Sequence, residues 1–63
     1  MNVLVNGERQ ELPAGSRVAD LVPVERRWIA VSLDGEVVPR SAWDETELAE
    51  GQRVEILEAR AGG

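Results

Sequence analysis

Apolar and polar residues alternate in several short stretches of the chain, a pattern that is typical of half-buried β-strands. The alternation is clearest at residues 28–33 and 53–58, and further strands are expected at residues 2–5, 8–12 and 36–38 from their β-branched residues and the turns beside them. In the stretch at 53–58, Val54 and Ile56 fall on one face, whereas Arg53 and Glu55 fall on the other. The stretch at 8–12 is mostly polar, which fits a strand at the edge of a sheet. The pattern therefore predicts five strands.

Two dipeptides mark the connections between neighbouring strands. Asn6-Gly7 stands between the first and second strands, and Asp34-Gly35 stands between the third and fourth. Both dipeptides favour a two-residue β-hairpin turn, because both central positions of that turn have a positive φ. Pro39 ends the fourth strand, since proline cannot donate to a ladder of backbone hydrogen bonds.

A short helix is predicted between the second and third strands, over residues 17–22. Ser16 is the expected N-cap residue. Pro23 limits the helix, because a residue that precedes proline is pushed out of the α region. The spacing of apolar residues gives the helix one apolar face, made by Val18, Leu21 and Val22. We expect this face to cover the sheet.

The order strand, strand, helix, strand, strand, strand predicts an α+β fold, in which a small mixed five-stranded sheet packs on one short helix. The first and last strands are the most regular apolar ones, so we place them side by side in the centre of the sheet. A chain of 63 residues makes one domain. We expect residues 1–58 to form it and residues 59–63 to form a flexible C-terminal tail.

The composition excludes several kinds of chemistry. The chain has no Cys, so it has neither a disulfide nor a thiolate nucleophile, and it has no His for acid–base catalysis near neutral pH. It also lacks a glycine-rich phosphate loop. The carboxylates at residues 44–50 lack the spacing of a calcium loop, and we interpret them as solvated surface. We therefore expect no bound metal or cofactor, and a protein that is not itself an enzyme.

The net charge is −5, and the seven basic residues are all Arg and are scattered along the chain. This distribution argues against nucleic acid as the main partner. It fits a partner with a basic docking surface, although negative charge also serves solubility alone. The sequence has no apolar run of roughly 20 residues and no signal-peptide pattern. We therefore expect a cytoplasmic protein that does not contact a membrane.

The sequence ends in Gly62-Gly63. Glycine has no Cβ, so such an end is thin enough to enter a narrow channel, and five tail residues reach about 15 Å. The terminal carboxylate is the group that remains for chemistry in a chain without Cys and His. Small residues are also tolerated at chain ends that have no function. The residues alone leave both interpretations open.

Several segments together resemble the ThiS family, the sulfur carrier proteins of bacterial thiamine thiazole synthesis. The resemblance runs over the whole chain and is most specific in the Val-Pro-Arg-x-x-Trp block at 38–43, combined with the terminal Gly-Gly. The chain departs from the family mildly, with Asp34 where the family often has Asn and a short segment before the third strand. The matching segments are residues 3–7, 15–21, 30–43, 51–56 and 61–63.

The resemblance implies a β-grasp (ubiquitin-like) fold and a reaction route that ends at Gly63. A ThiF-type adenylating enzyme would use ATP to convert the Gly63 carboxylate to an acyl-adenylate. A persulfide sulfur from a cysteine desulfurase system would then replace AMP, and the resulting thiocarboxylate would donate sulfur to thiazole synthase. The carrier itself would bind no cofactor, and its Ala61 and Gly62 would be required for activation.

Three residues are candidates for partner binding: Leu57, Arg40 and Trp43. Leu57 interrupts the polar outer face of the last strand, which suggests an exposed docking patch beside the tail. Trp43 is either a partner anchor or a packing residue, and Arg40 either holds a partner carboxylate or forms a local salt bridge. For Trp28, we favour a half-buried position at the start of a strand over stacking with an arginine.

Two alternative functions remain open at this point. The small subunit of molybdopterin synthase shares the Gly-Gly end, but it usually has a longer chain with more Phe and Leu, and this chain has no Phe or Tyr. A protein of another class, a ubiquitin-like interaction module, would bind a partner without reacting at its tail.

Overall fold

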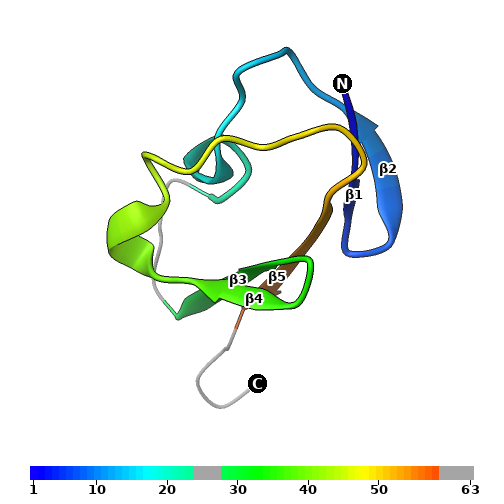
Figure 1. The fold of residues 1–63 in the computed structure, drawn as a ribbon. Coiled ribbons are helices and arrows are strands. Elements are labelled where there is room, and N and C mark those ends of the chain that lie inside the picture. The colour runs from blue at the N-terminus through cyan, green and yellow to red at the C-terminus, as the bar shows by residue number, and fades with distance from the viewer. Residues whose placement is uncertain (24–27, 59–63) are drawn as a thin grey trace.

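Five strands form one mixed sheet in the computed structural model, which describes residues 1–23 and 28–58. Figure 1 shows the β1–β2 hairpin at one edge of the sheet and the β3–β4 hairpin at the other. The order of the strands across the sheet is β2-β1-β5-β3-β4. The strands are β1 (Asn2–Val5), β2 (Glu8–Glu11), β3 (Ile29–Leu33), β4 (Glu36–Val38) and β5 (Arg53–Glu58).

The pairing of β1 with β5 joins the beginning of the chain to its last strand. This pair is parallel and brings Val5 opposite Val54, whereas the pairs β1–β2, β3–β4 and β3–β5 are antiparallel. The prediction that the first and last strands lie side by side is therefore confirmed. β5 is the central strand, because it alone has two strands on each side.

The two hairpin turns form as the dipeptides predict. The first residue of each turn has a positive φ, 51° at Asn6 and 48° at Asp34, and the glycine that follows each has a φ of 86° or 88°. Asn and Asp tolerate this left-handed conformation better than other non-glycine residues. Local sequence therefore fixes both turns.

The predicted helix over residues 17–22 is wrong in length. Only Val18–Asp20 is helical, as a single turn of 3-10 helix (η1). The predicted N-cap is also wrong, because the Ser16 hydroxyl donates a hydrogen bond to the Pro13 carbonyl at 2.8 Å. The N-cap residue is Arg17, and its backbone N–H donates a hydrogen bond to the Asp20 carboxylate at 2.8 Å. The stretch that remains before Pro23 is too short to complete several i→i−4 bonds.

The predicted half-buried position of Trp28 is also wrong. β3 begins one residue later, at Ile29, and Trp28 is 72% exposed with a φ of 58°. A tryptophan in the left-handed region cannot continue the extended strand, and the alternation of β3 would in any case place residue 28 on the outer face, with Ala30 and Ser32. The neighbouring Arg26 and Arg27 lie outside the described residues.

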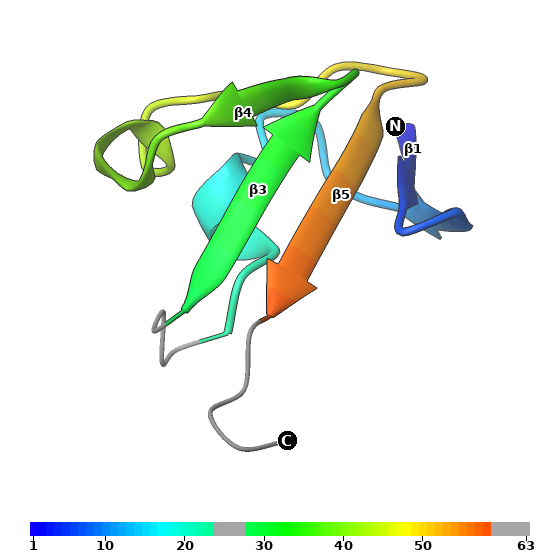
Figure 2. The ribbon, with the colours of Figure 1, turned by 90° about the horizontal axis from the view of Figure 1, so that it is seen from below.

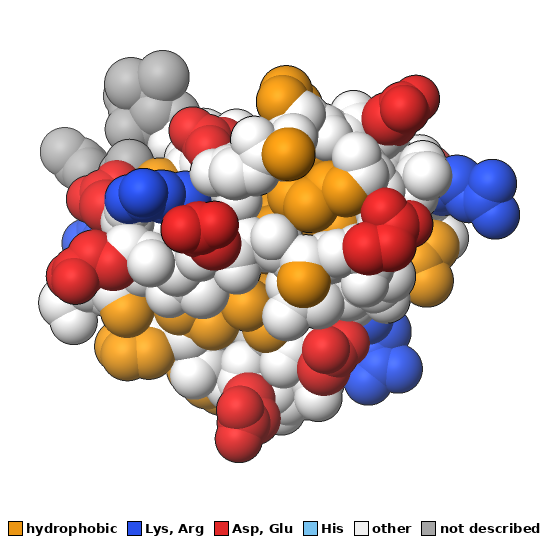
Figure 3. All heavy atoms as spheres, turned by 45° about the horizontal axis from the view of Figure 1, so that its top comes forward, with side chains coloured by type: hydrophobic (Ala, Val, Ile, Leu, Met, Phe, Trp, Pro, Cys, Tyr) orange, Lys and Arg blue, Asp and Glu red, His pale blue; other side chains and the backbone are white. Residues whose placement is uncertain are grey.

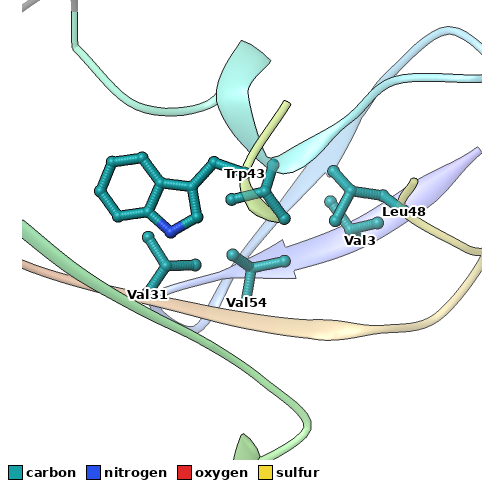
Figure 4. Close-up of a cluster of buried hydrophobic side chains, with 6 residues drawn as sticks. Val3, Val31, Trp43, Leu48 and Val54 are labelled. Carbon is teal, nitrogen blue, oxygen red and sulfur yellow. The ribbon is translucent and has the colours of Figure 1, made fainter. Parts of the chain in front are cut away.

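The core lies between the inner face of the sheet and the segments that cross it. Trp43, which follows the 3-10 turn η2 (Arg40–Ala42), fills the centre and is 1% exposed. Figure 4 shows its ring beside side chains from β3 and β5. The predicted inner face of the helix is confirmed in part, since Val18 is buried and Leu21 and Val22 pack against the core. The buried cluster is Val3, Val18, Val31, Trp43, Leu48 and Val54.

A hydrogen bond and a cation–π contact hold the Trp43 ring in this place. The indole Nε1 donates to the Val38 carbonyl at 2.9 Å, so the one polar atom of the ring is paired. The guanidinium of Arg40 lies over the ring, 5.7 Å from its centroid. The ring thus joins β4 to the segment that follows it.

In the part of the chain that the structure describes, no helix is long and apolar enough to cross a membrane.

The two tryptophans provide a matched test of the core. We expect Trp43→Ala to lower the free energy of unfolding by about 3–5 kcal/mol, because it leaves a cavity at the centre of the core. A domain of this size has a total stability of about 3–9 kcal/mol, so the variant should be largely unfolded or unfold at low denaturant. Trp28→Ala should change the stability by no more than about 0.5 kcal/mol.

Urea unfolding monitored by far-UV circular dichroism measures both effects without depending on tryptophan fluorescence. Equal unfolding midpoints for the two variants would contradict this assignment of the core.

Candidate functional site

The central strand β5 presents two different faces. Val54 and Ile56 point toward the core, as the alternation of the sequence predicts. Arg53, Glu55 and Leu57 are exposed on the opposite, outer face of the sheet. Leu57 is 71% exposed, although it is the apolar residue of that face. The predicted exposure of Leu57 is therefore confirmed.

A shallow groove of about 330 Å³ lies on this outer face, over β3, β4 and β5. Ala30 and Ser32 of β3 form its floor, because their side chains are small. The register of the sheet places Ala30 opposite Leu57 and Ser32 opposite Val37, so these two larger residues flank the floor. The groove therefore has apolar sides contributed by β4 and β5.

Val37 was missed as a site residue in the sequence analysis, and it is 77% exposed. A signal for it was present, because Val37 and Val38 are consecutive in a strand. Neighbouring residues of a strand point to opposite faces, so one of the two must point outward. Val38 is the one that packs against the core.

One carboxylate lies in the lining of the groove, and others are exposed on another face of the molecule. The Ser32 hydroxyl donates a hydrogen bond to Oε1 of Glu55 at 3.2 Å, which places a negative charge in the lining of the groove. Figure 3, which shows a different face of the molecule, has acidic side chains distributed among small apolar groups. The net charge of −5 therefore favours a partner with cationic groups.

The groove extends along the outer face as far as Leu57, the last residue but one of β5. The last pair of the β3–β5 ladder joins Ile29 to Glu58, one step beyond Leu57. Figure 2 shows β3 and β5 side by side, with β5 running toward the C-terminal end. The predicted site residues Ala61, Gly62 and Gly63, and with them the predicted tail 59–63, lie outside the described residues.

The other two candidates for partner binding have local roles. Trp43 is buried, so the structure supports the packing alternative and removes the ring from the docking surface. This is a correction, and its cause is the scarcity of large apolar side chains in a chain with only two aromatic residues. Among the described residues, the Arg40 guanidinium lies over the Trp43 ring. Arg40 is exposed and does not line the groove.

The groove has the chemistry of a binding surface. The polar side chains in its lining are the Asn6 amide, the Ser32 hydroxyl and the Glu55 carboxylate. Apolar flanks with a few polar groups can hold a partner's side chains.

Comparison with known proteins gives one family and a set of solved structures. The model of the ThiS family matches residues 3–63. A crystal structure of the thiamine biosynthesis protein ThiS from Geobacter metallireducens is 32% identical, with all of both chains covered and a TM-score of 0.81. A solution structure of a thiamine biosynthesis protein from the same organism is 32% identical and has a TM-score of 0.72, covering all of this chain and 88% of that one. No curated protein matches the chain.

Proposed function

The chain belongs to the ThiS family, and on this premise we propose that it is a sulfur carrier whose Gly63 carboxylate is converted to a thiocarboxylate. The observation that supports the proposal most strongly is the extent of the family match, which includes the terminal Gly62-Gly63. The β-grasp fold and the structural similarity to a ThiS protein agree with it. The absence of Cys and His supports a carrier that other enzymes modify.

The proposed route has an activation step and a sulfur-transfer step. A ThiF-type enzyme attaches AMP from ATP to a Gly63 carboxylate oxygen and releases pyrophosphate. A persulfide from a cysteine desulfurase system then attacks the Gly63 carbonyl carbon, and AMP leaves. A donor thiolate cleaves the S–S bond, which leaves the thiocarboxylate on the carrier and a disulfide on the donor. Thiazole synthase accepts the sulfur, and the carboxylate is regenerated.

The carrier contributes a substrate group and a docking surface to this route. The carbonyl of Gly63 has no side chain on its α-carbon to hinder attack, and Gly62 keeps the approach narrow. The groove flanked by Val37 and Leu57 is the proposed docking surface, because it lies beside the end of β5. ATP is consumed by the partner, and the carrier is a co-substrate rather than an enzyme.

The first prediction concerns the modified residue. Incubation of the protein with ATP, a sulfur source and the adenylating enzyme should raise its mass by the difference between sulfur and oxygen. Peptide mapping by mass spectrometry should place the gain at Gly63. A variant that lacks Gly63 is the control and should gain nothing.

The outcome of this experiment separates the candidate functions. A gain at an internal peptide would contradict the assignment of Gly63. Binding without any gain would favour a ubiquitin-like interaction module. A thiocarboxylate that is delivered to molybdopterin precursor, and not to thiazole synthase, would favour the molybdopterin synthase subunit.

A second prediction concerns the width of the tail. Gly62→Val should leave the free energy of unfolding within about 0.5 kcal/mol of the wild type, because the change lies beyond the last strand. Adenylation should be severely impaired, since a β-branched side chain widens and stiffens the segment that enters the channel. Pyrophosphate exchange measures adenylation directly. A wild-type exchange rate in this variant would show that a thin tail is not required.

A third prediction concerns docking at Leu57. Leu57→Glu should reduce sulfur transfer while the thermal midpoint stays close to that of the wild type, because the side chain is exposed. Leu4→Glu is the matched control, since Leu4 lies on the same outer face in β1 and outside the groove. If both variants lose transfer equally, added charge rather than the groove is responsible. If Leu57→Glu unfolds the protein, Leu57 has a role in stability.

The same docking step should also depend on ionic strength. The rate of association with the adenylating enzyme should fall as salt is added, because ions limit electrostatic attraction to about 8 Å at physiological ionic strength. Stopped-flow measurements across a salt series test this expectation. A rate that does not change with salt would mean that the acidic surface serves solubility alone.

A further inference from the structure

Both hairpin turns use their first residue to hold the central strand, at two different places. In the second turn, the backbone N–H of Asp34 donates to the Arg53 carbonyl at 2.8 Å, and the Asp34 carboxylate accepts from the Arg53 N–H at 2.9 Å. In the first turn, the backbone N–H of Asn6 donates to the Val54 carbonyl at 2.8 Å. The side chain of Asn6 then reaches Ile56, farther along β5.

The Asn6 amide satisfies both backbone groups of Ile56. Its Nδ2 donates to the Ile56 carbonyl at 3.2 Å, and its Oδ1 accepts from the Ile56 N–H at 2.8 Å. Had β1 continued past the turn, the backbone carbonyl of Asn6 would accept this N–H in the parallel ladder. The side chain thus extends the pairing of β5 beyond the last residue of β1.

β3 does not provide these hydrogen bonds on the other side of β5. Bonded and non-bonded residue pairs alternate along an antiparallel ladder. Because Asp34 and Arg53 form a bonded pair, the pair of Val31 and Ile56 falls at a non-bonded position. The N–H and carbonyl of Ile56 therefore point away from β3 and toward Asn6. Ile56 is the third residue from the end of β5, which ends at Glu58.

Asparagine is well suited to this position. Its φ of 51° is in the left-handed region, which Asn, Asp and Gly tolerate best. Its amide supplies both the donor and the acceptor that Ile56 requires. Aspartate would keep the acceptor and lose the donor, and glycine would keep the turn and lose both. At the other turn, the backbone N–H of Asp34 already donates to the Arg53 carbonyl. The side chain there has to provide only an acceptor for the Arg53 N–H, and the Asp34 carboxylate is sufficient for this.

We propose that Asn6 is a positioning residue that fixes the point at which the reactive tail leaves the sheet. The inference rests on the proposed function, because it concerns the activation of Gly63. β3 pairs with β5 as far as Glu58, and the Asn6 amide adds hydrogen bonds on the side of β1 as far as Ile56. Without the amide, Ile56 loses both hydrogen bonds on the side of β1, and β3 alone holds the end of β5. More residues must then be ordered when the tail enters a channel, which costs conformational entropy.

This cost acts on binding rather than on chemistry. Additional ordering on entry into the channel weakens the bound ground state and the transition state equally, so KM rises and kcat stays unchanged. We expect Asn6→Gly to raise the KM for the carrier in adenylation about tenfold, which corresponds to about 1.4 kcal/mol. The kcat should stay within about twofold of the wild type.

The experiment compares the wild type with Asn6→Gly, Asn6→Asp and Asp34→Gly. Pyrophosphate exchange with the ThiF-type adenylating enzyme, measured over a range of carrier concentrations, gives KM and kcat. Asp34→Gly is the matched control, because it also removes a side-chain bond to β5, but at Arg53, the first residue of that strand. Its KM should stay close to that of the wild type. Asn6→Asp keeps the turn and the acceptor, so its KM should lie between those of the wild type and Asn6→Gly.

Hydrogen exchange of the isolated carrier tests the hydrogen bonds between the Asn6 amide and Ile56, here called the Asn6 clamp, without any enzyme. In Asn6→Gly, the Ile56 amide should exchange at least about tenfold faster, while the Val54 amide stays protected. Unchanged protection at Ile56 would overturn the clamp. Faster exchange with an unchanged KM would overturn the positioning role.

Equal rises of KM in Asn6→Gly and Asp34→Gly would show a general loss of stability and would also overturn the inference. A wild-type protein that is never adenylated would instead contradict the proposed function, and the hydrogen exchange result would still decide the clamp. If Asn6→Gly fails to fold, Asn6→Asp carries the test, because it retains the side-chain oxygen that accepts the Ile56 N–H.

Discussion

The parallel pairing of β1 with β5 is the interaction on which the remaining structure depends. It inserts the last strand of the chain between the first strand and β3, so that β5 has neighbours on both sides. The residues that it pairs are far apart in the sequence, so the sheet closes only when both ends of the domain are present. A strand in this position is the most firmly held in the sheet. The tail therefore continues from the most restrained element of the molecule.

The alternation of side chains along β5 separates stability from recognition. Val54 and Ile56 contribute to the core, while Leu57 on the opposite face contributes to the groove. A chain of 63 residues buries a limited fraction of its surface, so each inward side chain is needed for folding. Outward side chains can change with little effect on stability. For this reason an apolar residue on the outer face is informative, whereas one on the inner face is not.

The sequence was sufficient to predict features that depend on local chemistry. Asn-Gly and Asp-Gly predict their turns because few other residues tolerate a positive φ. The alternation of apolar and polar residues predicts which residues of β5 point inward. The helix was overestimated because propensity ignores the bonds that the loop at 43–48 makes to the same segment, such as that from the Val18 N–H to the Thr46 carbonyl. The buried place of Trp43 and the exposed place of Trp28 depend on tertiary packing in the same way. The contact between Asn6 and Ile56 joins residues that are 50 positions apart, so no local sequence pattern predicts it.

Under the proposed function, the division between fold and tail follows from the chemistry of the reacting group. A terminal carboxylate is chemically the same on every protein, so an enzyme that activates it cannot select its substrate by that group. Selection must come from the folded surface and from the thinness of the segment that joins the two. The tail can reach only about 15 Å from Glu58, so the enzyme must contact the adjoining part of the sheet. The groove at Leu57 lies within that distance. If Asn6 positions the end of β5 as proposed, its bonds to Ile56 also fix the point from which the tail extends.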